Sequence, residues 1–216
     1  MLKDSFKLCK SFPRLGLARK DCNETKWIES IVYIGGFPSG TPPEVLLQRN
    51  STSRFYFKAK SDFVKNPIPE IGLEGLWKTF LEDDNPGIIL TPYGGKMRLI
   101  SESKIPFPHR NGTIFMIHYL SVWRNGENCT AKHIDWIRKV YNYMAQYVSK
   151  SPREAYVNYR DVDFGMNKKS NTSFEEASVW GNKYFKHNFN KLVKVKTQVD
   201  PHNFFRHEQS IPPLPI

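Results

Sequence analysis

The stretch from Thr113 to Trp123 constrains the fold of this chain more than any other. Its β-branched and aromatic residues favour an extended strand, and apolar side chains fall on both faces of that strand. A strand that is apolar on both faces belongs in the middle of a covered sheet. We therefore expect residues 113–123 to form a central strand.

Other segments predict the partners of this strand. From Phe55 to Lys60, Phe and Ala alternate with Tyr and Lys, which is the period of a half-buried strand. The segments 87–91 and 96–100 flank Pro92-Tyr93-Gly94-Gly95, whose glycines favour the turn of a hairpin. Residues 27–34 are aromatic and β-branched up to Gly35-Gly36, so we expect another strand there.

Helical patterns lie between these segments. They cover residues 2–12, 41–47, 73–81 and 134–148, and Pro13 and Pro152 mark two of their ends. Ser173 and Glu176 have the spacing of a capping box, which predicts the start of a further helix. Strands interspersed with helices predict an α+β fold, a mainly antiparallel sheet with helices on one side.

Composition narrows the class of protein. The 216 residues are 39% hydrophobic, which is enough to bury one sizeable core. No run approaches the roughly 18 apolar residues that span a bilayer, and residues 1–6 lack the apolar stretch of a signal peptide. The net charge of +11 comes from scattered residues, and the dense region 183–196 fits the solvated face of an amphipathic helix. We therefore expect neither a nucleic-acid partner nor a membrane partner.

Five sequons without a central proline point to an ancestry in the secretory pathway. Their acceptors are Asn23, Asn50, Asn111, Asn128 and Asn171. The three cysteines, Cys9, Cys22 and Cys129, cannot all pair within the chain, and none has the spacing of a metal or redox motif. A bridge from Cys9 to Cys22 and a partner in another domain remain open alternatives.

Two stretches are long and rich in uncommon residue types. The first is Ala155-Tyr156-Val157-Asn158-Tyr159-Arg160-Asp161, and the second is the tail from Val199 to Pro215, which contains Asp200-Pro201-His202-Asn203-Phe204-Phe205. Together they resemble the C-terminal part of the berberine bridge enzyme-like flavin oxidases, the plant family that includes the cannabinoid synthases. The resemblance continues through Lys65-Asn66-Pro67-Ile68-Pro69-Glu70, Thr91-Pro92-Tyr93-Gly94-Gly95 and Ile105-Pro106-Phe107-Pro108-His109-Arg110.

The resemblance implies a domain organisation. Residues 1–150 would form a substrate-binding region, and residues 151–216 a C-terminal segment that folds back against an FAD-binding domain. Nothing in this chain corresponds to that domain or to its covalent attachment residues. The family would use FAD, a small-molecule substrate (an alcohol, a sugar or a specialised metabolite) and oxygen. The parent protein would be a monomer in the secretory pathway, in the cell wall or the vacuole.

The resemblance also implies roles for the first motif. Tyr156, Val157 and Asn158 would contact the flavin, and Tyr159 would be the catalytic base. A tyrosine acts as a base when positive charge or hydrogen bonds pull a phenol pKa down from about 10. Arg160 is adjacent in sequence, but consecutive residues of a regular strand point to opposite faces. The segment must therefore kink if its tyrosines share one cofactor. The alternative is a buried Tyr159 whose hydroxyl bonds to the backbone.

The face of strand 113–123 that carries Met116 and His118 would look toward the flavin and the substrate. Family members often hold Lys or Glu in place of Met116 and Gln in place of His118, and cannabinoid synthases hold a substrate-contacting Tyr in place of Thr91. Met116 cannot transfer a proton, whereas His118 could act as a base or orient a hydroxyl. A core histidine with satisfied hydrogen bonds and a hairpin threonine are the alternatives.

The sequence holds no converging metal ligands and no phosphate-cradling glycine loop, so we expect no metal site. We interpret the chain as the C-terminal portion of an oxidase that transfers a hydride from a substrate carbon to FAD. The alternatives are a non-catalytic glycoprotein fragment that binds a ligand or carbohydrate, and a fragment without independent function.

Overall fold

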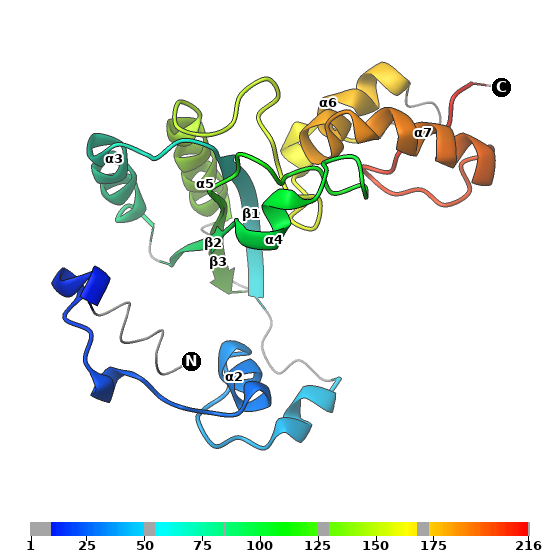
Figure 1. The fold of residues 1–216 in the computed structure, drawn as a ribbon. Helices are drawn as coiled ribbons and strands as arrows, with labels where there is room; N and C mark the ends of the chain where they lie inside the picture. Colours follow the sequence, from blue (N-terminus) through cyan, green and yellow to red (C-terminus); the bar gives the residue numbers. More distant parts are fainter. Residues whose placement is uncertain (1–9, 50–54, 84, 125–129, 168–172, 216) are drawn as a thin grey trace. The chain divides into compact units, whose positions relative to one another are not determined.

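A computed structural model describes residues 10–49, 55–83, 85–124, 130–167 and 173–215 (Figure 1). It divides into two compact units, residues 1–53 and residues 54–216. Six α-helices, four short 3-10 helices and three strands are formed by the described residues. Among these helices, none has both the length and the apolar character needed to cross a bilayer.

The first unit contains α2 (Trp27–Ile34) and three 3-10 helices, Pro13–Leu15, Arg19–Asp21 and Pro43–Leu47. The prediction of a strand over residues 27–34 is therefore wrong. The backbone N–H of Lys26 donates to the Glu29 carboxylate at 2.9 Å, and this cap outweighs the β-branched composition. The helix expected up to residue 47 is confirmed as a 3-10 helix, and most of the helix expected over residues 2–12 lies outside the described residues.

The second unit is built on an antiparallel sheet in the order β1-β3-β2. Its strands are β1 (Phe55–Val64), β2 (Pro86–Pro92) and β3 (Phe115–Arg124). The long apolar strand of the sequence is thus central, as predicted. Its register pairs His118 with Ser61 on one side and with Ile89 on the other.

The predicted hairpin between residues 87 and 100 is wrong. Residues 95–99 form the short helix α4 (Gly95–Leu99), and β2 pairs with β3 instead. Gly95 has a φ of +52°, so the chain turns out of the strand direction there. Because β3 is longer, every residue of β2 can pair with it in an antiparallel ladder. The pairing continues beyond β2, where the Tyr93 N–H donates to the Ile114 carbonyl at 2.8 Å.

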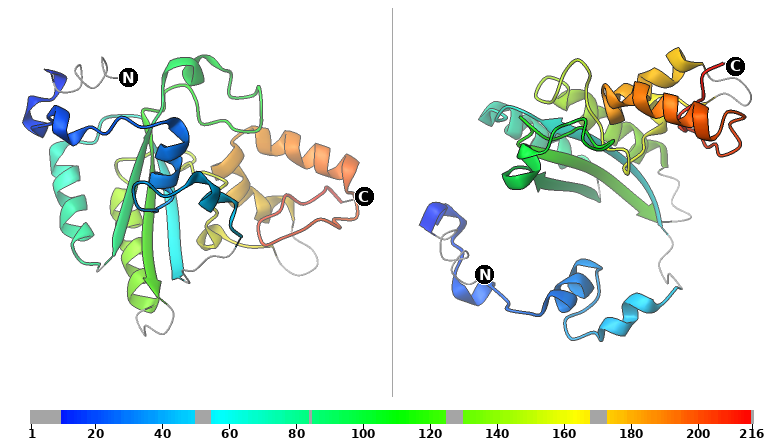
Figure 2. Two further views of the ribbon diagram at one scale, coloured as in Figure 1. Left: turned by 90° about the horizontal axis from the view of Figure 1, so that it is seen from below. Right: turned by 45° about the vertical axis from the view of Figure 1, so that its right-hand side comes forward.

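Helices α3 (Glu70–Phe80) and α5 (Thr130–Met144) lie on one face of the sheet (Figures 1 and 2). The main core forms where α5 meets the inward side chains of β1 and β3. Its fully buried members include Val64, Ile117, Ile137, Val140 and Met144. Burial of this apolar surface is the principal stabilisation of the unit.

Helices α6 (Phe174–Phe185) and α7 (Asn188–Val199) pack against each other on the β1 side of the sheet (Figure 2). The predicted capping box is confirmed, because the Ser173 hydroxyl accepts from the N–H of Glu176 at 3.1 Å and the Glu176 carboxylate accepts in return. Around Trp180, Phe189 and Val193 a second core forms. The fold class is thus the predicted α+β.

Within the second unit, α5 is the described helix that packs broadly on β1 and β3, and it lies on one face of the sheet. Directly paired residues share a face, so Ser61, His118 and Ile89 lie together on the other face, as do Phe63, Met116 and Thr91. Ile89 keeps 51% of its surface exposed and Phe57, further along β1, keeps 60%. This open, partly apolar face is where the sequence motif meets the sheet.

Candidate active site

Residues 156–160 form a tight turn rather than an extended strand. The N–H of Tyr159 donates to the carbonyl of Tyr156 at 2.9 Å. The two rings therefore meet edge to face, with centroids 5.1 Å apart. The Asn158 amide also donates to the Tyr156 hydroxyl at 2.7 Å. The kink that the sequence required is present, and it gathers the three polar side chains of the motif.

Residues on both sides of the turn fasten it. The N–H of Tyr156 donates to the Ser61 hydroxyl of β1 at 2.9 Å, next to His118 in the sheet register. Before the turn, Arg153 forms a two-pronged ion pair with Asp62, a carboxylate with no exposed surface. After the turn, Asp161 pairs with Lys58 at 2.7 Å and with the buried Lys60. These contacts hold the turn against the sheet without using its own side chains.

The ring of Tyr159 lies flat on the ring of His118, with centroids 3.7 Å apart and planes 9° apart. Both ring nitrogens of His118 are buried and have no hydrogen-bond partner among the described residues. The Tyr159 hydroxyl likewise makes no hydrogen bond to another described residue. Neither residue therefore fits its structural alternative, a core side chain with satisfied hydrogen bonds. Tyr141 and Trp180 also have buried polar atoms without partners in the described parts of the chain, so the candidate site rests on the stack of Tyr159 and His118 together.

Burial lowers the pKa of His118, because a charged imidazolium loses its hydration there. Its ring is therefore neutral near neutral pH and offers one N–H donor and one acceptor. Met116 is buried beside it on the same sheet face and pairs in register with the half-buried Thr91 of β2. The structure thus brings Thr91, Met116, His118 and Tyr159 to one region of the open face.

An aromatic cluster borders this region, and the sequence reasoning missed it. Phe107 stacks with Tyr93 at 6.3 Å and meets the ring of Tyr156 edge on at 5.8 Å. Burial raises the pKa of Tyr93 to about 12, so it stays a neutral phenol. The run Ile105–His109 is part of the family resemblance, but only its three-dimensional contact with the Tyr156 turn reveals the cluster.

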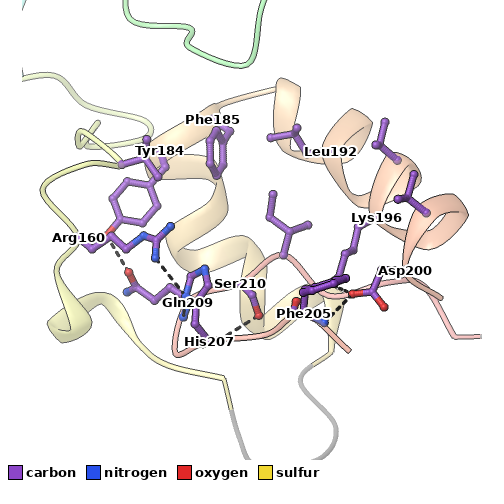
Figure 3. A pocket seen from close by; sticks show the side chains of 14 residues that line it. Arg160, Tyr184, Phe185, Leu192, Lys196, Asp200, Phe205, His207, Gln209 and Ser210 are labelled. Atoms are coloured by element: carbon purple, nitrogen blue, oxygen red, sulfur yellow. Dashed lines mark hydrogen bonds and ion pairs between the residues drawn. The ribbon is translucent and has the colours of Figure 1, made fainter. Parts of the chain in front are cut away.

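Val157 and Arg160 point to a different place. They line a pocket of about 420 Å³ between α6, α7 and the C-terminal tail (Figure 3). The Arg160 guanidinium lies 3.3 Å from Nδ1 of His207. Val157 also packs on the core of α6 and α7. The charge of Arg160 is thus directed at the tail, and any contact of Val157 with a cofactor on the Tyr159 side would use its backbone.

The described residues could contact the ring of a flavin, but they provide no site for the rest of the cofactor. The unpaired nitrogens of His118, the exposed Asn158 and the open sheet face offer hydrogen bonds and a flat apolar surface. No glycine-rich loop that could cradle a pyrophosphate stands among the described residues of this region. No cluster of His, Cys, Asp and Glu that could hold a metal ion is present in the described parts either.

The remaining predicted sites lie at the surface. The glycosylation acceptors Asn23 and Asn111 are exposed, while Asn50, Asn128 and Asn171 lie outside the described residues. Cys22 is exposed with a free thiol. Cys9 and Cys129 also lie outside the described residues, so their pairing stays open.

Comparison with known proteins shows which family this chain resembles. The family model "Berberine and berberine like" matches residues 155–212. A monolignol oxidoreductase of Arabidopsis thaliana, AtBBE-like 13, is 58% identical over 203 residues, which are 94% of this chain and 37% of that protein. The chain belongs to the berberine bridge enzyme-like family, of which it represents the C-terminal part. The resemblance noted in the sequence is thereby confirmed.

A further relative and a solved structure support the assignment to the berberine bridge enzyme-like family. Tetrahydroberberine oxidase of Argemone mexicana is 48% identical over 207 residues, 94% of this chain and 38% of that protein. The solved structure of BBE-like 28 from Arabidopsis thaliana superposes with a TM-score of 0.90 at 44% identity and covers all of this chain and 45% of that chain. The family is FAD-dependent, and its FAD-binding domain is not in this chain. The chain thus spans less than half the length of these relatives.

Proposed function

We propose that this chain forms the substrate-binding side of an FAD-dependent oxidoreductase in which Tyr159 is the base. The observation that carries this proposal is the stack of Tyr159 on His118 beside the partly exposed sheet face, in which both His118 nitrogens are buried without partners and the Tyr159 hydroxyl bonds to no described residue. Most buried polar atoms are satisfied within a fold, so these two stacked rings call for a further partner. A catalytic role leaves them free for the substrate.

The chemistry follows from these positions. When bound, FAD supplies the acceptor for a hydride and passes the electrons on to oxygen. The Tyr159 oxygen, as a phenolate, takes the proton from a substrate hydroxyl as the hydride leaves the adjoining carbon, and an alcohol becomes a carbonyl compound. Arg160 is directed at the tail, so the positive charge or hydrogen bonds that stabilise the phenolate would come from the FAD-binding part. Asn158 and Tyr156, together with the backbone of Val157, would hold the flavin ring at the turn. Neutral His118 orients the substrate hydroxyl through the nitrogen that accepts or the one that donates.

The surroundings of the stack favour a substrate with an aromatic ring. Phe107, Tyr93 and Tyr156 present ring faces and edges to the same region, and such rings bind flat apolar molecules well. The name of the 58% identical relative, a monolignol oxidoreductase, fits an aromatic alcohol. Thr91 and Met116 would shape the rest of the pocket. We assign no proton transfer to Met116, because a thioether carries no transferable proton.

The setting of the parent protein is part of the proposal. Residues up to 150 supply the substrate face, and residues 151–216 lie against the FAD-binding domain. Two exposed sequons, at Asn23 and Asn111, support passage through the secretory pathway to the cell wall or the vacuole. The full-length protein would act as a monomer on a small molecule and oxygen.

A chimera tests the proposal, in which this chain follows the flavin-binding part of AtBBE-like 13. Under anaerobic conditions, an aromatic primary alcohol should bleach the flavin absorbance, and readmitted oxygen should restore it. Aliphatic alcohols and sugars of similar size serve as matched comparison substrates. A chimera that binds flavin but is reduced by none of these compounds would refute the proposal and favour a binding role.

A further inference from the structure

Arg110 is a buried cation without a counter-charge. Only 4% of the surface of this residue is exposed, and Lys60 is the other Lys or Arg buried to this degree among the described residues. Lys60 pairs with two carboxylates, Asp161 and Asp163. No carboxylate of the described residues forms an ion pair with Arg110. A buried charge is normally paired, because removing it from water is costly.

The contacts of Arg110 are all with neutral groups. Its Nε donates to the Phe107 carbonyl at 3.2 Å, and its Nη1 points at the Met97 sulfur at 2.9 Å. The guanidinium carbon also lies 5.4 Å from the centre of the Phe107 ring. A guanidinium has five N–H groups. Two are used in these contacts, so three remain, which is enough to meet a carboxylate with two parallel bonds.

The fold holds Arg110 rigidly in this position. The preceding residue, His109, is fully buried and is held by the Glu154 carboxylate at 2.8 Å and the Tyr184 carbonyl at 3.0 Å. The following turn closes with the bond from the Thr113 N–H to the Arg110 carbonyl at 3.3 Å. Arg110 is therefore fixed beside Phe107, which contacts the Tyr156 ring. A fixed, desolvated guanidinium is a strong and selective partner for an acidic side chain.

We propose that Arg110 receives an Asp or Glu carboxylate from the FAD-binding domain of the full-length protein, and that this ion pair docks the domain on the present chain. Two observations favour this source. The chain covers 37% of AtBBE-like 13, so most of such a protein adjoins it from outside. The chain also carries a net charge of +11, which calls for an acidic partner surface.

The proposal is tested by the direction in which one substitution shifts the melting temperature. Arg110→Met keeps the length of the stem and removes the charge. In the 216-residue chain alone it should leave the melting temperature unchanged or raise it, because an unpaired buried charge disappears. In the chimera with the flavin-binding part of AtBBE-like 13 it should lower the melting temperature by about 2–4 °C or more. Arg98→Met, at an exposed arginine of α4, is the matched control and should change neither.

A loss of equal size in both proteins would overturn the proposal, since the value of Arg110 would then lie in its contacts with Phe107 and Met97. An unchanged chimera would overturn it as well. A crystal structure of the chimera decides the matter if the chain alone melts without a cooperative transition. A carboxylate of the flavin-binding part on Arg110 supports the ion pair, whereas water or a small anion there contradicts it. These measurements need no substrate, so their failure leaves the proposed role of Tyr159 untouched.

Discussion

At the scale of single residues, His118 is distinguished among the described residues by having two unpaired buried ring nitrogens and a stacked Tyr159 ring. Most buried polar atoms of the described unit have partners, as the Asp62 carboxylate has in Arg153 and Tyr119. His118 has none, although an unsatisfied buried group costs about 1–3 kcal/mol. The fold bears this cost at the position where the substrate hydroxyl is proposed to bind.

Two substitutions of His118 separate its proposed role from that of a base. In the chimera, His118→Gln keeps one donor and one acceptor, so it should shift substrate preference while flavin reduction by the best substrate changes by about threefold or less. His118→Leu removes both atoms and should lower kcat/KM by about tenfold. Burial lowers the pKa of His118, so any loss of rate caused by its protonation should appear on the acid side and vanish in His118→Gln. Complete loss of flavin reduction in His118→Gln would make His118 the base.

Glu154 allows a prediction about how the stability of the fold depends on pH. Burial alone would raise its pKa, but hydrogen bonds from His109 and Lys65 outweigh burial and lower the pKa to about 2. A lowered carboxyl pKa stabilises the fold above the ordinary value of 4.5, and this stabilisation is lost as the pH falls toward 2. Glu154→Gln should therefore cost about 3 kcal/mol in urea unfolding at pH 7 and less as the pH falls below 4.5. Glu74→Gln, at an exposed carboxylate of α3, should cost nothing at either pH.

At the scale of elements, the packing of α6 on α7 depends on one glycine. A Cβ at Gly181 would lie 2.4 Å from the ring of Phe189, which is fully buried in the second core. Alanine has the higher helix propensity by about 1 kcal/mol, but here the clash dominates. Gly181→Ala should therefore destabilise the unit by about 1–3 kcal/mol. Val179→Ala, at an exposed position of the same helix, should be neutral or slightly stabilising in the same thermal melt, and a neutral Gly181→Ala would contradict the packing.

The elements also show what could be predicted from the sequence. Strand 113–123 and the helix after Ser173 were predictable, because apolar periodicity and a capping box act within a few residues. The helix α2 was not, since the Glu29 cap competes with a β-branched composition. The pairing of β2 with β3 was also not predictable, because hydrogen bonds between segments far apart in the sequence leave no local pattern. In the site, the motif identified Tyr156 and Tyr159, whereas the contact of Phe107 with Tyr156 exists only in the folded chain.

At the scale of the whole molecule, the proposed function makes this chain one side of a site. Helices cover one face of the sheet, while Phe57 and Ile89 remain exposed on the other. Exposed apolar residues such as Phe57 and Ile89 are typical of a surface that another domain covers. The comparisons agree, since the chain spans 37–39% of the curated relatives it matches.

The 216-residue chain should therefore not retain FAD by itself. The turn at Tyr156 can contact the flavin ring, but the described residues offer no cradle for the pyrophosphate. Purified chain should show no flavin absorbance after incubation with FAD and gel filtration, and the chimera should carry the cofactor. One equivalent of FAD retained by the chain alone would contradict this division of the site.

Anaerobic flavin reduction in the Tyr159→Phe chimera tests the central claim most directly. Phenylalanine keeps the ring that stacks on His118 and removes the oxygen that takes the proton. We expect FAD to bind and the melting temperature to stay unchanged, while the rate of flavin reduction by an aromatic alcohol falls by about 10²–10⁴. Tyr156→Phe controls for the loss of a neighbouring phenol and should reduce the rate far less. Flavin reduction at the parental rate in Tyr159→Phe would contradict the account.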